Sequence, residues 1–145
     1  MKKYLIILSL ILAFLNTKCT SNYHKETKGV KGYISNINNE VEQIYILIPT
    51  HICNQCIKNL IQYLNVIEKP KISVIFISET NKDIYLFSKY LSNKYKIIKE
   101  TKNKYLKKLD YIVIAIKKKN KIVLKKFPEN NFFMIKKTIH NFDNL

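Results

Sequence analysis

Apolar residues form three continuous runs along the chain, and each run has the length of a β-strand. The runs are rich in isoleucine and read "QIYILI" (43–48), "KISVIFIS" (71–78) and "DYIVIAI" (110–116). A run without polar alternation predicts a strand that is buried on both faces of a sheet. A fourth strand, "IVLKKF" (122–127), follows the third after the turn "KKKNK" (117–121), and the two together predict a hairpin.

Elsewhere the apolar residues recur at the spacing of a helix. A first helix is predicted to begin at Cys53 and to end before Lys69 and Pro70. One of its faces is made of Cys56, Ile57, Leu60, Ile61, Leu64 and Ile67. A second is predicted over 80–93, because Thr80 and Asp83 have the spacing of a capping box. The pattern after it indicates a short strand at 96–99 and a helical turn near Tyr105.

A last helix is predicted to open at Pro128 and Glu129, since proline favours the first turn of a helix. Its apolar face consists of Phe132, Ile135, Ile139 and Phe142.

The predicted order is therefore β-α-β, a connecting helix, and β-β-α. Parallel pairing of the first two strands needs a right-handed crossover, which the first helix supplies. We thus expect one α/β domain over 41–145, with a central mixed β-sheet flanked by helices. Residues 19–40 are polar and contain both glycines, so they predict a tether that ends in a short strand around residues 32–37.

The first residues have the pattern of an export signal. "MKK" is a basic start, and "YLIILSLILAFL" (4–15) is too short to span a bilayer but suits the apolar part of a signal peptide. "LNTKC" then resembles a bacterial lipoprotein signal, which implies a signal peptide over 1–18 and lipidation at Cys19. The expected location is the bacterial cell envelope, with the domain membrane-anchored through the lipid and facing the periplasm.

Composition and charge narrow the choice of partner. Apolar residues make up 47% of the 145 residues, which is ordinary for a globular domain. The formal net charge is +16, and every one of the 26 basic residues is lysine. Base and phosphate recognition depends heavily on the arginine fork, so we expect a solvated lysine surface and no nucleic-acid partner.

The segment "HICNQC" (51–56) carries the candidate chemistry. Outside the cytoplasm, disulfides form and persist, so a cysteine pair there suggests redox chemistry. Cys53 is expected just past the first strand, at the start of the first helix. Helix N-termini stabilise thiolates and can lower a cysteine pKa from about 8.5 to roughly 3.5–7.5. Cys56, one turn further on, is placed to resolve a mixed disulfide.

Two other interpretations of the pair stay open. The segment also resembles the metal loop of small heavy-metal-binding domains, and His51, Cys53 and Cys56 together would suit Cu(I) or Zn(II). No further cysteine pair completes a four-ligand site, and those domains place their hairpin earlier. Alternatively, the cysteines are merely buried or form a structural disulfide, although so short a loop removes little unfolded-state entropy.

The chain resembles the thioredoxin-like superfamily over about residues 41–145. The resemblance lies in the order of its elements, which are a strand, a C-x-x-C at a helix start, a strand, a helix, a β-hairpin and a helix. The resemblance implies a thiol–disulfide oxidoreductase with Cys53 as attacking and Cys56 as resolving thiol, and with His51, Asn54 and Gln55 as candidate modulators. It implies no cofactor and no bound metal. The expected partners are exported proteins with thiols or disulfides, and an upstream redox partner.

The resemblance also leaves room for a redox-inactive, thioredoxin-like binding lipoprotein. The family's cis-proline would fall near Asp110 or Tyr111, and neither position is proline.

Overall fold

The protein is described here from a computed structural model, which covers residues 25–37, 42–68, 71–119, 121–127 and 131–144. The predicted signal peptide, Cys19 and the start of the predicted tether lie outside these residues.

Five strands form one mixed sheet in the order β3-β2-β1-β4-β5. Their bounds are Glu42–Pro49 for β1, Ile72–Ile77 for β2, Lys96–Glu100 for β3, Ile112–Lys118 for β4 and Lys121–Phe127 for β5. β1, β2 and β3 pair in parallel, whereas β4 is antiparallel to β1 and β5 is antiparallel to β4. The parallel pair, the hairpin and the short strand after residue 95 are therefore as predicted.

The sheet is apolar on both faces, because alternate residues of the same strands enter two separate cores. In β1, Ile44, Ile46 and Ile48 belong to one core and Tyr45 and Leu47 to the other. β2 and β4 divide in the same way. Successive side chains of a strand point to opposite faces, and both faces are buried here, so each strand needs an apolar residue at almost every position.

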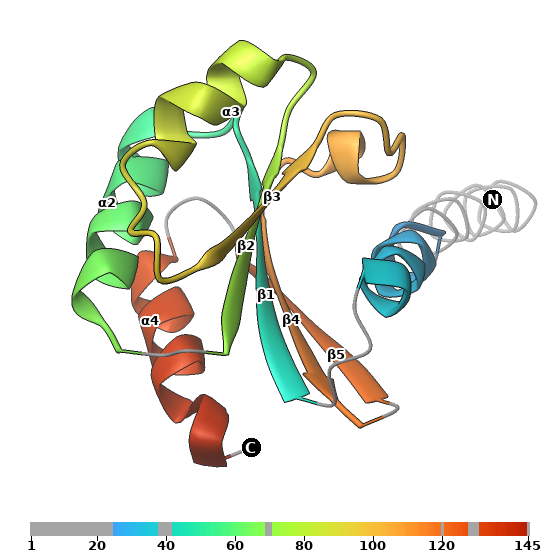
Figure 1. The fold of residues 1–145 in the computed structure, drawn as a ribbon. Coiled ribbons are helices and arrows are strands. Elements are labelled where there is room, and N and C mark those ends of the chain that lie inside the picture. The colour runs from blue at the N-terminus through green and yellow to red at the C-terminus, as the bar shows by residue number, and fades with distance from the viewer. Residues whose placement is uncertain (1–24, 38–41, 69–70, 120, 128–130, 145) are drawn as a thin grey trace, which may run out of the picture.

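Three helices cover the first face, as Figure 1 shows. They are α2 (Asn54–Val66), α3 (Asn81–Ser88) and α4 (Phe132–His140). Both βαβ crossovers, through α2 and through α3, run in the same direction across the sheet, so right-handed connections put both helices on one side. The apolar stripes predicted for α2 and α4 are buried, as Leu60, Leu64, Ile135 and Ile139 show.

The second predicted helix is shorter than 80–93, because its end is diverted toward α2. The side chain of Asn65 donates to the Tyr90 carbonyl at 2.8 Å and accepts from the Ser92 N–H at 2.9 Å. These bonds take up backbone groups that a longer helix would have used internally. The start of α4 is Phe132, and the predicted opening at Pro128 and Glu129 lies outside the described residues.

The second face is covered by a helix that the sequence did not predict. Residues 25–37 are helical, so the strand expected around 32–37 is wrong, and so is the tether over this stretch. Val30 and Ile34 are fully buried against Tyr45 and Leu47. Tyr33 and Ile37 are partly buried against the same core, so four apolar side chains at positions 30, 33, 34 and 37 form the face of this helix. The spacing is helical, but Gly29 and Gly32 lie among these residues and disfavour a helix, so the pattern was not recognised in the sequence.

The remaining cover of this face comes from the segment between β3 and β4. It contains the short 3-10 helix η1 (Leu106–Lys108), near the predicted turn, and buries Leu106 and Leu109. Figure 1 shows this segment and the 25–37 helix on the side of the sheet opposite α2 and α4. The element order and the sheet topology confirm the predicted α/β fold class, a central mixed β-sheet flanked by helices.

Candidate functional site

Cys53 is the N-cap residue of α2, at the place where β1 has ended and the helix begins. Its sulfur accepts the backbone N–H of Cys56 at 3.3 Å, and its carbonyl accepts the N–H of Ile57 at 3.1 Å. The sulfur thus occupies the position that a serine or aspartate oxygen takes in an ordinary cap. The first turn of α2 has no acidic residue, so no carboxylate on that turn offsets the positive end of the helix.

Cys56 lies one turn further along α2, and both cysteines are half-buried thiols. The bond from the Cys56 N–H to the Cys53 sulfur shows that the two residues are close together. Partial exposure of both residues is compatible with thiol–disulfide exchange, since the attacking thiol needs access and the resolving thiol must reach it.

The opposite end of α2 is held by the segment that leads into β3. The Tyr95 hydroxyl donates to the carbonyls of Leu64 and Ile67, at 2.5 and 3.0 Å. The Lys94 ammonium donates to the carbonyls of Asn65 and Ile67, at 3.1 and 2.6 Å. Burial raises the pKa of Tyr95 to about 12, with a smaller contribution from Tyr63. The helix that carries the cysteines is therefore fixed at its far end by side chains that satisfy its last carbonyls.

The candidate modulators lie around the pair on the surface. His51, Asn54 and Gln55 are exposed, and the Gln55 amide donates to the Asn59 side chain at 2.9 Å. The apolar neighbour Ile52 is buried and anchors the loop between β1 and α2.

Within the described ranges, no group of three or more His, Cys, Asp and Glu side chains is arranged to hold a metal ion. His51 therefore does not join Cys53 and Cys56 in a ligand set, and the structure gives the metal interpretation no support.

Asp110 and Tyr111 precede β4 beside the end of β1, because Leu47 pairs with Val113 in the antiparallel register. The Tyr111 hydroxyl donates to the Glu26 carboxylate, which also pairs with the Lys126 ammonium at 2.8 Å. Burial raises the pKa of Tyr111 to about 12, and the bond to Glu26 adds to this shift. The segment at 110–111 is thus tied to the 25–37 helix on the second face.

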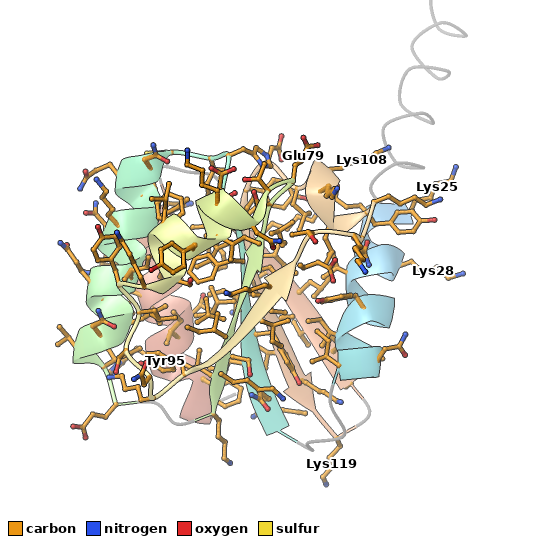
Figure 2. The ribbon with its side chains drawn as sticks, turned by 45° about the horizontal axis from the view of Figure 1, so that its top comes forward. Lys25, Lys28, Glu79, Tyr95, Lys108 and Lys119 are labelled. Carbon is orange, nitrogen blue, oxygen red and sulfur yellow. The ribbon has the colours of Figure 1, made fainter. Side chains whose placement is uncertain are left out.

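A polar cleft of about 360 Å³ opens at the end of the sheet where β1 and β2 finish. Thr50 and His51 line it after β1, and Ser78 and Glu79 line it after β2. Thr80, Asp83 and Lys107 complete the lining. Figure 2 shows Glu79 at the end of the molecule opposite Lys119 in the β4–β5 turn. The ends of parallel strands are where open α/β sheets bind ligands.

The sequence alone did not predict this cleft. Thr80 and Asp83 were recognised as a helix cap, which is correct, since the Asp83 N–H donates to the Thr80 hydroxyl at 3.3 Å. Their proximity to Thr50 depends on the register of β1 against β2, and Lys107 arrives from the other face. One feature of the sequence could have indicated the cleft. Polar residues come at the ends of the first two apolar runs, at 50–51 and at 78–79, and the ends of parallel strands lie at the same edge of a sheet.

Within the described ranges, no helix has the length and apolar character needed to cross a membrane.

Comparison with protein-family models finds no match, and comparison with curated proteins finds none either. One solved structure with a related arrangement is that of a thioredoxin-like protein from Aeropyrum pernix. The two chains share 19% sequence identity with a TM-score of 0.47, over 72% of this chain and 80% of the other.

Proposed function

We propose that the protein is a thiol–disulfide oxidoreductase that acts through Cys53 and Cys56. The observation that carries the proposal is the capping bond from the Cys56 N–H to the Cys53 sulfur at the start of α2. This arrangement favours the thiolate of Cys53, which is the nucleophile in disulfide exchange. It also keeps the second sulfur within one helical turn of the first.

The exchange has two steps. The Cys53 thiolate attacks one sulfur of a partner disulfide, the partner's S–S bond breaks, and the leaving thiolate takes up a proton. The Cys56 thiolate then attacks the Cys53 sulfur, so the second partner thiol leaves and a Cys53–Cys56 disulfide forms. The partner disulfide is reduced, the protein is oxidised, and the two protons of the protein thiols end on the two partner thiols. The same steps in reverse oxidise a partner dithiol.

Single serine variants distinguish the two roles. We expect Cys53→Ser to abolish reduction of insulin disulfides in the presence of dithiothreitol. Cys56→Ser should instead accumulate a mixed disulfide through Cys53, visible by non-reducing electrophoresis and mass spectrometry. In the wild-type protein, Cys53 should alkylate faster than Cys56 near neutral pH. Equal, slow labelling of both thiols together with full activity of either variant would contradict the proposal.

A redox-inactive binding protein of the same fold would not reduce insulin in these assays. Its biological function would also survive in the double variant Cys53→Ser, Cys56→Ser. No contact in the described structure favours that alternative over disulfide exchange.

We further propose that the protein works in the bacterial cell envelope on exported proteins, held at the membrane by a lipid on Cys19. The support is the sequence of the leader and the position of Cys19 after it. Cells that express the protein should incorporate radioactive palmitate into it, and Cys19→Ser should remove the label. Labelling that persists in this variant would rule out Cys19 as the lipid site.

A further inference from the structure

The polar cleft beside His51 has a lining that the proposed exchange between Cys53 and Cys56 does not use. It carries both signs of charge, with the acids Glu79 and Asp83 and the base Lys107. Lys107 comes from η1, so residues from both faces of the sheet meet here.

Among the lining residues, Thr50 gives the strongest indication that the cleft binds a ligand. It is only 7% exposed, yet it lines the cleft. Its backbone N–H donates to the Ile77 carbonyl at 2.8 Å, but its hydroxyl has no hydrogen-bond partner among the described residues. The Thr50 oxygen is not among the solvent-excluded side-chain atoms that lack a partner, so it is open to the cleft and available to a bound molecule.

The two acids differ in how firmly they are held. One oxygen of Asp83 accepts the hydroxyl of Thr80 at 2.6 Å and that of Ser78 at 3.3 Å, which fixes the carboxylate in place. The side chains of Glu79 and Lys107 make no hydrogen bond or ion pair with other residues in the described ranges. An ammonium group and a carboxylate group of a ligand would therefore both find a counter-charge.

We propose that this cleft binds a small zwitterionic disulfide of the amino-acid type, or the corresponding thiol, as a redox partner of Cys53. The ligand's ammonium group pairs with Glu79 and Asp83, and its carboxylate pairs with Lys107 and accepts the hydroxyl of Thr50. A volume of about 360 Å³ suits a small molecule, since such pockets run from about 300 to 1,000 Å³.

The chain itself connects the cleft to the thiol. Cys53 follows the cleft residue His51 by two positions, a span of at most about 7 Å. A purely cationic ligand would leave Lys107 without a counter-charge, and a purely anionic one would meet two carboxylates. Only a ligand with both charges satisfies the whole lining.

The inference rests on the proposed exchange chemistry and adds its substrate class. With cystine, the Cys53 thiolate attacks one sulfur and displaces the first cysteine. Cys56 then attacks the Cys53 sulfur and displaces the second cysteine. Cystine is reduced to two cysteines, the protein is oxidised to its disulfide, and the two thiol protons of the protein end on the two products.

Four disulfides test the inference through the rate at which each oxidises the reduced protein. They are cystine, the cationic cystamine, the anionic 3,3′-dithiodipropionate and the neutral bis(2-hydroxyethyl) disulfide. We expect cystine to have the lowest KM. Glu79→Gln should raise KM for cystine and cystamine about three-fold, the scale of one exposed ion pair. Lys107→Met should raise KM for cystine and dithiodipropionate to a similar degree, and Thr50→Val should raise it about five-fold for the same two compounds.

Two matched variants serve as controls. Glu68→Gln and Lys108→Met remove exposed charges that do not line the cleft, so they should leave all four KM values unchanged. A binding measurement independent of the reaction uses the variant Cys53→Ser, Cys56→Ser, in which cystine should shift the NMR signals of Thr50, Glu79 and Lys107.

The outcomes separate the two proposals. If the neutral disulfide oxidises the protein normally but cystine shows no preference and no NMR shifts, the cleft assignment is wrong while the exchange chemistry stands. If none of the four disulfides oxidises the thiols, the exchange chemistry itself is wrong. Equal effects of the cleft and control variants would also overturn the cleft, because they would reduce it to general surface charge.

Discussion

The two faces of the sheet are covered by different kinds of contact. On one face, α2 and α4 bury apolar stripes against the even-numbered residues of β1, β2 and β4. On the other face, the 25–37 helix buries Val30 and Ile34 completely and Tyr33 and Ile37 in part, and it adds four contacts of other kinds. Glu26 bonds with Tyr111 and Lys126, Tyr33 bonds with Glu100, and Gly29 lies against Tyr105.

This difference teaches how each face is specified. A stripe of many apolar side chains follows the period of the helix and can therefore be recognised in the sequence. Such a stripe also tolerates the substitution of a single apolar side chain by another of similar volume. The 25–37 helix has a shorter apolar stripe, and its polar pairs and one close approach make it depend more on individual atoms. The second face should therefore respond to small substitutions that the first face would absorb.

The largest expected effect comes from filling the space at Gly29. A Cβ atom there would lie 3.0 Å from both Cβ and Cγ of Tyr105, atoms too near the backbone to move aside by a rotamer change. Overpacking of this kind costs about 1–3 kcal/mol, against a gain in helix propensity of up to about 1 kcal/mol. We expect Gly29→Ala to lower the free energy of unfolding by about 1 kcal/mol and to speed amide exchange over residues 25–37.

Gly32 provides the matched control on the same helix. A Cβ atom there would meet nothing within 4 Å, so Gly32→Ala should raise stability by about 0.5–1 kcal/mol through helix propensity alone. The two substitutions are chemically identical and should have opposite signs in urea unfolding. If both stabilise the protein equally, Tyr105 does not hold the helix, and the contrast between the faces is weaker than described.

The same contrast explains which parts of the fold could be predicted from the sequence. The runs that became β1, β2 and β4 were evident because burial on both faces removes polar residues altogether. The stripe of α2 was equally clear. The 25–37 helix was missed because Gly29 and Gly32 reduce helix propensity, and its partners Tyr105 and Glu100 are about 70 residues away along the chain.

The candidate site divides in a similar way. The position of Cys53 at the start of α2 followed from local sequence alone, since strand, proline and helix period fix it. The cleft did not, because Thr50, Ser78 and Lys107 converge only once three strands and the crossing segment are assembled. A local pattern can predict a nucleophile at a helix terminus, whereas a ligand site formed by several elements needs the topology.

The smallest expected effect concerns the Tyr33–Glu100 pair, which links the 25–37 helix to the end of β3. Burial raises the pKa of Tyr33, and the bond to Glu100 raises it further. For Glu100, burial alone would raise the pKa, but bonds from the N–H groups of Lys102 and Asn103 and from Tyr33 lower it overall below 4.5. The Lys102 N–H lies 2.7 Å from the carboxylate and the Asn103 N–H 2.9 Å.

The pair should therefore stabilise the protein over a defined pH window. Because the pKa of Glu100 is lower in the folded state, its contribution is complete above pH 4.5 and is lost as the pH falls through the folded value. Because the pKa of Tyr33 is higher in the folded state, its contribution is complete below pH 10.0 and is lost as the pH rises through the folded value. We expect Tyr33→Phe to cost less than about 1 kcal/mol at pH 7, and less at pH 3.

Tyr85→Phe is the control, since Tyr85 is 62% exposed on α3 and belongs to the other face. Urea unfolding followed by circular dichroism at pH 3 and pH 7 measures both variants against the wild-type protein. A cost of Tyr33→Phe that is the same at both pH values would mean that lost ring packing, and not the bond to Glu100, is responsible. The second face would then be held by apolar contact like the first, and the 25–37 helix would differ from α2 only in the number of such contacts.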